Sequence, residues 1–144
     1  MDNVGNAYVT ATILLNPPFF DYPTTSNALL SPSFGGPVRA VVTKLDASGS
    51  SLLYSTYLGS APTAPTSSGS ISGGIVVDTS GNAYVTGRAE PVGFFTTTGA
   101  FAACSMMNPS VFVMKLNTTS LISVPPVYSP CLGPGWGTGI AVDT

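Results

Sequence analysis

The feature that most constrains this chain is an internal repeat, in which short sequence blocks occur twice in the same order. Residues 5–10 read GNAYVT, and residues 81–86 read the same. The other paired blocks are 22–29 with 94–101, 42–46 with 113–117, 53–59 with 127–133, and 74–79 with 139–144. Because self-similarity at a long period is the signature of repeat architectures, we expect two copies of one structural unit.

The blocks predict short β-strands. Residues 75–77 and 83–86 are rich in β-branched and aromatic side chains, which favour strands. The run DTSGN at 78–82 consists of turn-forming residues and predicts a hairpin. Further strands are expected at 38–45, 52–58, 111–116 and 124–132. Prolines interrupt the last of these, so it belongs at a sheet edge. No helical periodicity is sustained, and the chain is predicted to be all-β.

Composition restricts the kind of protein. Charged residues make up 7% of the chain, against roughly 25% in a typical soluble domain. Such a surface suits an extracellular or cell-surface protein, or one buried against copies of itself. With four basic residues and a net charge of −2, the chain has no basic patch for phosphates, so we expect no nucleic-acid partner. No apolar run reaches the ~20 residues of a membrane span. If the protein is secreted, its leader is expected to have been removed or to lie outside this chain.

The blocks resemble the SBBP family of bacterial β-propeller repeats. A strand ending in Val-Asp, a Gly-Asn turn and the sequence AYVTG occupy residues 75–87. The rest of the family pattern is found at 94–101, 111–116 and 53–59. The resemblance covers nearly the whole chain and implies a propeller blade with the Val-Asp strand innermost and the Tyr-Ser-Thr-Tyr strand outermost. It also implies a surface or secreted protein and brings no catalytic residues. The sequence departs from the pattern at Ala11 and at Pro130-Cys131.

The predicted fold is therefore a β-propeller-type repeat with two four-stranded blade equivalents, cut within the inner hairpin. Residues 1–72 form a blade that lacks its inner strand, 73–138 form a complete blade, and 139–144 are the inner strand of a following blade. Closed propellers typically have about 4–8 blades. The missing blades come either from copies of this chain or from a longer array of which this chain is an excerpt.

The acidic residues favour a structural role over catalysis. There is no histidine, which excludes Ser-His-Asp and Cys-His catalysis and the commonest zinc ligand. Asp2, Asp78 and Asp143 occupy the same place in the repeat, unlike the two carboxylates that flank a glycosidase cleft. Asp78 is expected to accept backbone N–H bonds within a tight turn, and not to begin a calcium loop. We expect no enzyme activity, no metal site and no cofactor.

Other recurring side chains are also interpreted as structural. The stems of Lys44 and Lys115 are expected to cover apolar surface, rather than present a charge to a ligand. Tyr84 and Ile75 are predicted to be largely buried, on adjacent strands of one hairpin. The recurring tyrosines are expected to pack in the core and between blades rather than to stack on sugars; they are Tyr8, Tyr54, Tyr57, Tyr84 and Tyr128.

Three further features do not follow the repeat. Trp136 lies among glycines and is the best candidate for contact with a ligand, such as a surface glycan. Asn117 begins the glycosylation sequon NTT. Cys104 and Cys131, the only cysteines, fit either a disulfide or two free thiols. The extracellular composition favours the disulfide.

The sequence thus predicts a non-enzymatic, extracellular structural repeat protein that associates head to tail with copies of itself. One chain would donate a strand and the next would accept it. The donor strand is Gly139, Ile140, Ala141 and Val142, and the acceptor strand is Ala7, Tyr8, Val9 and Thr10. The contact is heterologous and gives a ring or a filament, with the filament slightly favoured. The alternative is a glycan- or protein-binding module of a larger secreted or cell-surface propeller.

Overall fold

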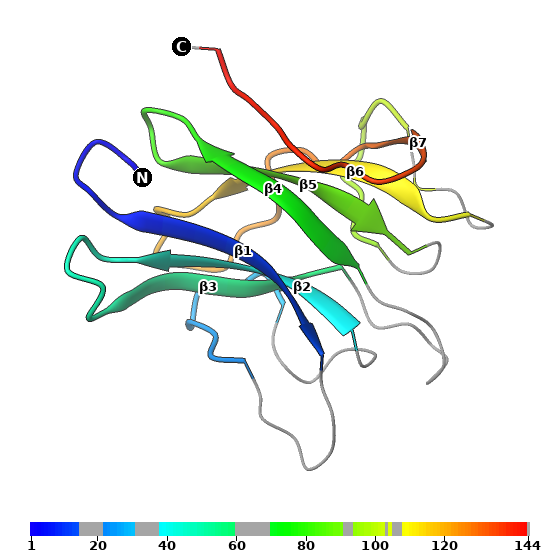
Figure 1. The fold of residues 1–144 in the computed structure, drawn as a ribbon. Coiled ribbons are helices and arrows are strands. Elements are labelled where there is room, and N and C mark those ends of the chain that lie inside the picture. The colour runs from blue at the N-terminus through cyan, green and yellow to red at the C-terminus, as the bar shows by residue number, and fades with distance from the viewer. Residues whose placement is uncertain are drawn as a thin grey trace.

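The computed structural model describes residues 1–14, 22–30, 38–59, 70–90, 94–102, 104 and 108–143, which form two antiparallel sheets (Figure 1). The strands are β1 (Ala7–Leu14), β2 (Val38–Leu45), β3 (Leu52–Leu58), β4 (Ile71–Val77), β5 (Asn82–Ala89), β6 (Ser110–Asn117) and β7 (Cys131–Pro134). The described residues include no helix. The predicted all-β propeller-repeat fold is confirmed.

The first sheet has three strands in the order β1-β2-β3. The β1–β2 ladder is regular along its whole length, from Ala7 opposite Leu45 to Leu14 opposite Val38. The strand β3 pairs with the other side of β2, after a register shift at Lys44. Within the described residues, the edge of β1 that faces away from β2 has no strand partner. In the described part of the chain, the first sheet thus has one strand fewer than the second.

The second sheet has four strands in the order β4-β5-β6-β7. Its first two strands form the predicted hairpin, which the backbone closes by a hydrogen bond of 3.0 Å from the Asp78 N–H to the Asn82 carbonyl. Gly81 turns the chain with a φ of +80°, a conformation that glycine adopts without steric cost. The strand β4 therefore pairs with β5 on the side where β1, the counterpart of β5, has no paired strand among the described residues.

The outer strand of the second sheet differs from its prediction at 124–132. The regular ladder is only Cys131–Pro134, and an isolated bridge joins Lys115 to Tyr128. Pro130 has no N–H to donate, although its carbonyl accepts a bond of 3.2 Å from the Val113 N–H. The prolines therefore shorten this strand, whereas its counterpart β3 has the bounds that the sequence predicted.

One apolar core runs through both sheets. It contains Ala40, Val42 and Leu58 from the first sheet, and it continues through residues of the second sheet such as Val85 and Phe112. The strand β1 packs beside β4 (Figure 1). Burial of such apolar surface is the dominant favourable contribution to folding. The two blades therefore stabilise each other.

Tyr84 and Ile75, which were predicted to be largely buried, are partly buried in the structure. They lie on adjacent strands, β5 and β4, and Ile75 packs against the apolar core. Ile75 lies on an edge strand, and Tyr84 directs its hydroxyl toward the hairpin turn rather than into the core. By contrast, Tyr54 and Tyr57 of β3 are buried.

A disulfide joins Cys104 to Cys131, with their Cα atoms 4.9 Å apart. This confirms the predicted pairing. Cys131 is buried at the start of β7, and its N–H donates to the Ala102 carbonyl at 3.1 Å. The bridge therefore fastens the connection between β5 and β6 to the outer strand.

Candidate functional site

The carboxylate of Asp78 is the centre of a polar cluster at the β4–β5 turn. We call this cluster the Asp78 station; it consists of Asp78, Asn82, Tyr84 and Lys115. The Oδ1 atom of Asp78 accepts hydrogen bonds from the N–H groups of Ser80 at 3.0 Å and Asn82 at 2.9 Å. Its Oδ2 accepts from the Asn82 side-chain amide at 2.8 Å and the Tyr84 hydroxyl at 3.1 Å. The Lys115 ammonium lies 3.5 Å from the same oxygen.

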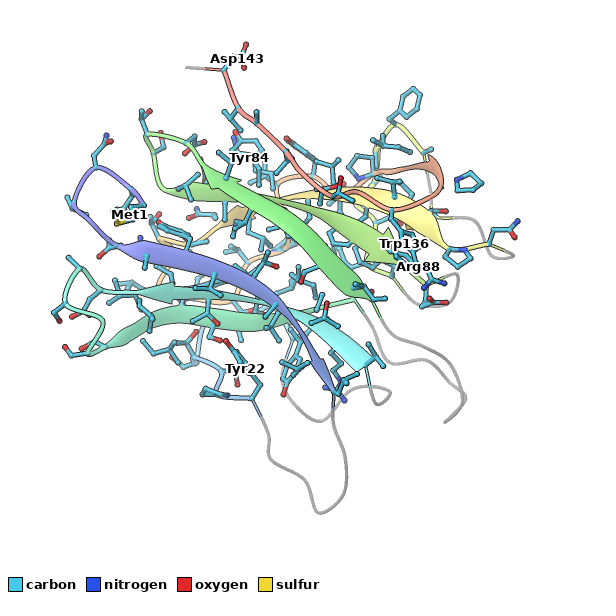
Figure 2. All side chains as sticks on the ribbon, in the orientation of Figure 1. Met1, Tyr22, Tyr84, Arg88, Trp136 and Asp143 are labelled. Carbon is cyan, nitrogen blue, oxygen red and sulfur yellow. A yellow bond between two sulfur atoms is a disulfide. The ribbon has the colours of Figure 1, made fainter. Side chains whose placement is uncertain are left out.

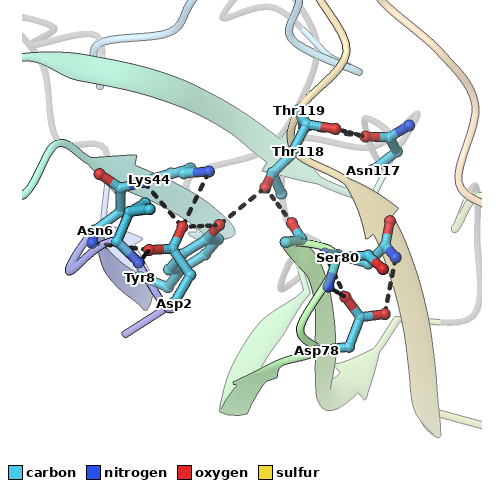
Figure 3. A network of polar contacts seen from close by, with 12 residues as sticks. Asp2, Asn6, Tyr8, Lys44, Asp78, Ser80, Asn117, Thr118 and Thr119 are labelled. Carbon is cyan, nitrogen blue, oxygen red and sulfur yellow. Dashed lines mark hydrogen bonds and ion pairs between the residues drawn. The ribbon is translucent and has the colours of Figure 1, made fainter.

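The same cluster recurs in the first sheet as the Asp2 station, which consists of Asp2, Asn6, Tyr8 and Lys44 (Figure 3). Here Oδ1 accepts from the N–H groups of Val4 at 3.2 Å and Asn6 at 2.9 Å. The Asn6 amide, the Tyr8 hydroxyl and the Lys44 ammonium lie 2.8, 3.1 and 3.3 Å from Oδ2. Each station thus presents the same kinds of donor to one carboxylate.

The lysine of each station also covers the tyrosine ring. The Lys44 ammonium lies 5.0 Å from the centre of the Tyr8 ring, and that of Lys115 lies 4.7 Å from the centre of the Tyr84 ring. At these distances an ammonium is attracted to the negative face of the ring. The lysines therefore do more than cover apolar surface with their stems, because their charged ends complete a paired cluster.

The stations hold their charged forms at neutral pH. Desolvation raises the pKa of Asp78, but the bonds from Asn82, Tyr84 and Ser80 outweigh it and lower the pKa to about 2. The same opposing causes hold the pKa of Asp2 well below its usual range. The Tyr84 hydroxyl and the Asp78 charge raise the pKa of Lys115, against desolvation. Each carboxylate is therefore a fixed negative charge that its neighbours stabilise.

Polar contacts connect the two sheets at one seam. The Thr118 hydroxyl donates to the Gly81 carbonyl at 2.7 Å and lies 3.4 Å from the Tyr8 hydroxyl, so it links the β4–β5 turn to the Asp2 station (Figure 3). Farther along, the Ser72 N–H donates to the Thr12 hydroxyl at 3.1 Å. The seam therefore places the second blade in a fixed position against the first.

A hollow of about 200 Å³ lies between the turn at residues 2–6 and the β4–β5 turn. One side is lined by Asp2, Asn6 and Lys44, and the other by Thr79, Ser80 and Thr119. The charged groups on the first side already pair with each other. The hollow is therefore a polar gap between adjacent turns.

The predicted donor segment, residues 139–142, forms no strand in the structure. It continues from a close approach to the second sheet, where the Gly137 N–H donates to the Gly87 carbonyl at 3.2 Å. A Cβ on Gly73 would collide with the Gly137 carbonyl, so glycine permits this approach. Ile140 and Val142 are half-buried while their neighbours are exposed, and this alternation is that of a strand.

Trp136 lies near the end of β5, away from the stations (Figure 2). Its side chain is 67% exposed, and the Arg88 guanidinium carbon lies 5.5 Å from the ring centre. Arg88 also pairs with Glu90 at 2.9 Å. When the alignment of 74–79 with 139–144 is extended toward the N-terminus, Trp136 aligns with Ile71 in the sequence, so the position does have a counterpart in the repeat. Contact between Trp136 and a ligand stays a prediction.

Asn117 is the last residue of β6. Its side-chain oxygen accepts bonds from the N–H and the hydroxyl of Thr119, at 3.0 and 2.8 Å. Glycosylation of Asn117 stays a prediction. In the part of the chain that the structure describes, no group of three acidic or cysteine side chains is placed to hold a metal ion. Nor does that part contain a helix long and apolar enough to cross a membrane.

Sequence reasoning found the turn bonds of Asp78 but not the stations as units. It treated the aspartates, lysines and tyrosines separately. The signal was available, because Asp, Asn, Tyr and Lys recur together in both copies, as Asp2, Asn6, Tyr8 and Lys44 and as Asp78, Asn82, Tyr84 and Lys115. Four polar residues that repeat as a set indicate a shared contact.

Comparison with known proteins supports the repeat. Residues 53–89 match the family model described as SBBP, β-propeller repeat. The match runs from the outer strand of the first sheet through the β4–β5 hairpin of the second. One family repeat thus spans the seam between two sheets. No curated protein matches the chain. Residues 53–89 therefore carry a β-propeller repeat of the SBBP type, as the resemblance of the blocks predicted.

Proposed function

We propose that this chain is a non-enzymatic structural propeller module that associates head to tail with copies of itself by strand addition. The observation that carries the proposal is the open edge of β1, which stands where its counterpart β5 is paired with β4. An unpaired edge presents a row of backbone donors and acceptors to an incoming strand. Edge pairing gives affinity through the main chain, and side-chain pockets give specificity.

The intact hairpin supplies the register of the proposed contact. There Ile75 lies opposite Val85, and Val77 lies opposite Ala83. By repeat equivalence, Ile140 of one chain would lie opposite Val9 of the next, and Val142 would lie opposite Ala7. Residues 139–142 make no ladder in the described structure, so their backbone is available as a donor.

Donor and acceptor surfaces differ, so the contact is heterologous and gives a ring or an open filament. Because closed propellers have about 4–8 blades, a ring would hold roughly two to four chains. An extracellular or cell-surface location is supported by the disulfide, since such bonds persist in oxidising compartments. The scarcity of charged residues also lowers repulsion between stacked copies.

A second candidate function is a binding module for surface glycans, which the exposed ring of Trp136 favours. Exposed aromatic rings provide a large apolar face for ligand contact. Tryptophan fluorescence, titrated with a panel of soluble glycans, tests this. A saturable change that Trp136→Ala abolishes supports it, and an unchanged spectrum with every glycan contradicts it for that panel.

Deletion of residues 139–144, followed by sedimentation and light scattering, tests strand addition. We expect the full chain to associate with rising concentration and the truncated chain to stay monomeric. A second disrupting variant keeps the chain length and replaces Ala141 by proline, which removes one backbone N–H group from the segment that would be added. Thermal melts verify that both variants fold. A full chain that is monomeric throughout, or a truncated chain that assembles like it, contradicts strand addition.

A further inference from the structure

We propose that the Asp2 station is a carboxylate socket for Asp143 of a second copy, and that Asp2 is its internal competitor. This inference rests on the proposed function, because strand addition would deliver Asp143 to the socket. The groups that would donate to the incoming carboxylate are those of Asn6, Tyr8 and Lys44. The ligand is an aspartate side chain at the end of an added strand.

The first step is the position of Asp143 in the repeat. The block GIAVDT at 139–144 aligns with GIVVDT at 74–79, so Asp143 stands in the place of Asp78. In the intact hairpin, Val77 pairs with Ala83, and Asp78 follows directly at the turn. A strand that pairs with β1 in the same register has Val142 opposite Ala7. It therefore carries Asp143 to the turn that holds Asn6.

The second step is the chemistry of the socket. Four of its donors are the Asn6 N–H, the Asn6 amide, the Tyr8 hydroxyl and the Lys44 ammonium, all within 3.3 Å of the Asp2 carboxylate. The Asp78 station has the same four donors around a carboxylate from an inner strand. The first sheet therefore carries a preorganised carboxylate site, whose inner strand is not among the described strands.

The third step is exclusivity. Both oxygens of Asp2 are already engaged, and its side chain is 9% exposed. Two carboxylates sharing one set of donors repel each other, and one of them would have to take up a proton. The Asp2 N–H also donates to the Asn6 carbonyl at 3.2 Å, as the Asp78 N–H does to that of Asn82. Asp143 can therefore enter only when both the side chain and the backbone of Asp2 leave. In the single chain Asp143 is exposed, so it loses no described contact on entering the socket.

The consequence is a self-limiting contact. Asp2 competes as a group of the same chain, and competition of this kind lowers the apparent affinity for the incoming strand. Removing Asp2 should strengthen association, whereas neutralising Asp143 should weaken it. A hydrogen-bonded charge corresponds to about a tenfold change in affinity or more.

The experiment uses a fluorescent peptide with the sequence of residues 137–144 and the full chain at concentrations below its self-association. Anisotropy measures the peptide affinity for the wild-type chain and for the variants Asp2→Ala and Asp2→Asn. We expect about tenfold tighter binding to both variants. A second peptide with Asp143→Asn should bind about tenfold more weakly to each. Since Asp2→Ala also alters the turn, the isosteric Asp2→Asn keeps the result interpretable.

Two controls separate the socket from general charge effects. Asp46→Asn removes one charge at another turn of the first sheet, and Asp78→Asn weakens the internal station of the second. Neither should change the peptide affinity, although Asp78→Asn should lower the melting temperature. If both peptides bind equally and Asp2 variants do not differ from wild type, the socket is wrong while strand addition survives. If neither peptide binds to any variant, both proposals are wrong.

Discussion

The outer strands of the two sheets, β3 and β7, are held in place by different contacts. In the first sheet, β3 is continuous, and the buried Tyr57 accepts a hydrogen bond of 2.9 Å from the Tyr22 N–H. The two rings also meet edge to face, with centres 6.4 Å apart. In the second sheet, Cys131 stands in the place of Tyr57 and is joined to Cys104. An aromatic anchor in one copy is thus a covalent anchor in the other.

The difference follows from the prolines. Where prolines break the outer strand, fewer ladder bonds hold it to β6. Both copies nevertheless retain one polar clamp, in which a serine hydroxyl in β3 or just before β7 donates to the β1–β2 connection or to its counterpart, the β5–β6 connection. Ser55 donates to the Pro23 carbonyl at 2.7 Å, and Ser129 donates to the Phe95 carbonyl at 2.6 Å. The disulfide therefore adds to the clamp where the ladder is weakest.

Removal of the disulfide should have the largest effect on this comparison. Replacing Cys104 and Cys131 together by alanine should lower the free energy of unfolding by about 3–4 kcal/mol, because the unfolded chain regains loop entropy. Urea denaturation under oxidising conditions measures the loss. A reductant should destabilise the wild type by a similar amount and leave the variant unchanged. A loss below about 1 kcal/mol would mean that the covalent anchor contributes little beyond the aromatic one.

The serine clamps should give the next largest effect. Ser129→Ala and Ser55→Ala should each lower the free energy of unfolding by about 0.5–1.5 kcal/mol, because the hydrogen bond of the serine hydroxyl is lost. Both side chains are fully buried, so water does not readily replace the hydroxyl. Matched urea titrations of the two variants compare the copies directly. If only one substitution destabilises the protein, the clamps are not equivalent.

The repeat predicted most of the fold because it depends on local patterns. The strand bounds of β2 and β3 and the β4–β5 hairpin follow from β-branched residues and turn formers. The bounds of β7 did not follow, since the effect of Pro130 on pairing depends on which backbone groups face the neighbour. The burial of Tyr84 also depends on its distant partner Lys115. Contacts between strands far apart in sequence require the register.

The smallest effect should come from acid, and it compares the two stations. The pKa of Asp78 is lowered from 3.8 to about 2, so its folded form holds protons less tightly than the unfolded chain. Such a group contributes stability above pH 3.8, and the contribution is lost as the pH falls through about 2. Melting temperatures should therefore be level from pH 7 to about pH 5 and should fall by a few degrees toward pH 2.

Single substitutions show how much each station contributes to the fall in melting temperature at acid pH. Asp78→Asn should melt at a lower temperature than wild type at pH 7, and the difference should close as Asp78 of the wild type becomes protonated. Because the pKa of Asp2 is also lowered by hydrogen bonds to its carboxylate, the corresponding gap for Asp2→Asn should close in the same acid range. Differential scanning calorimetry at intervals of pH measures both gaps. Gaps that stay constant with pH would show that the carboxylates act through shape rather than charge, and the two stations would then be hydrogen-bonded turns without a stabilising ion pair.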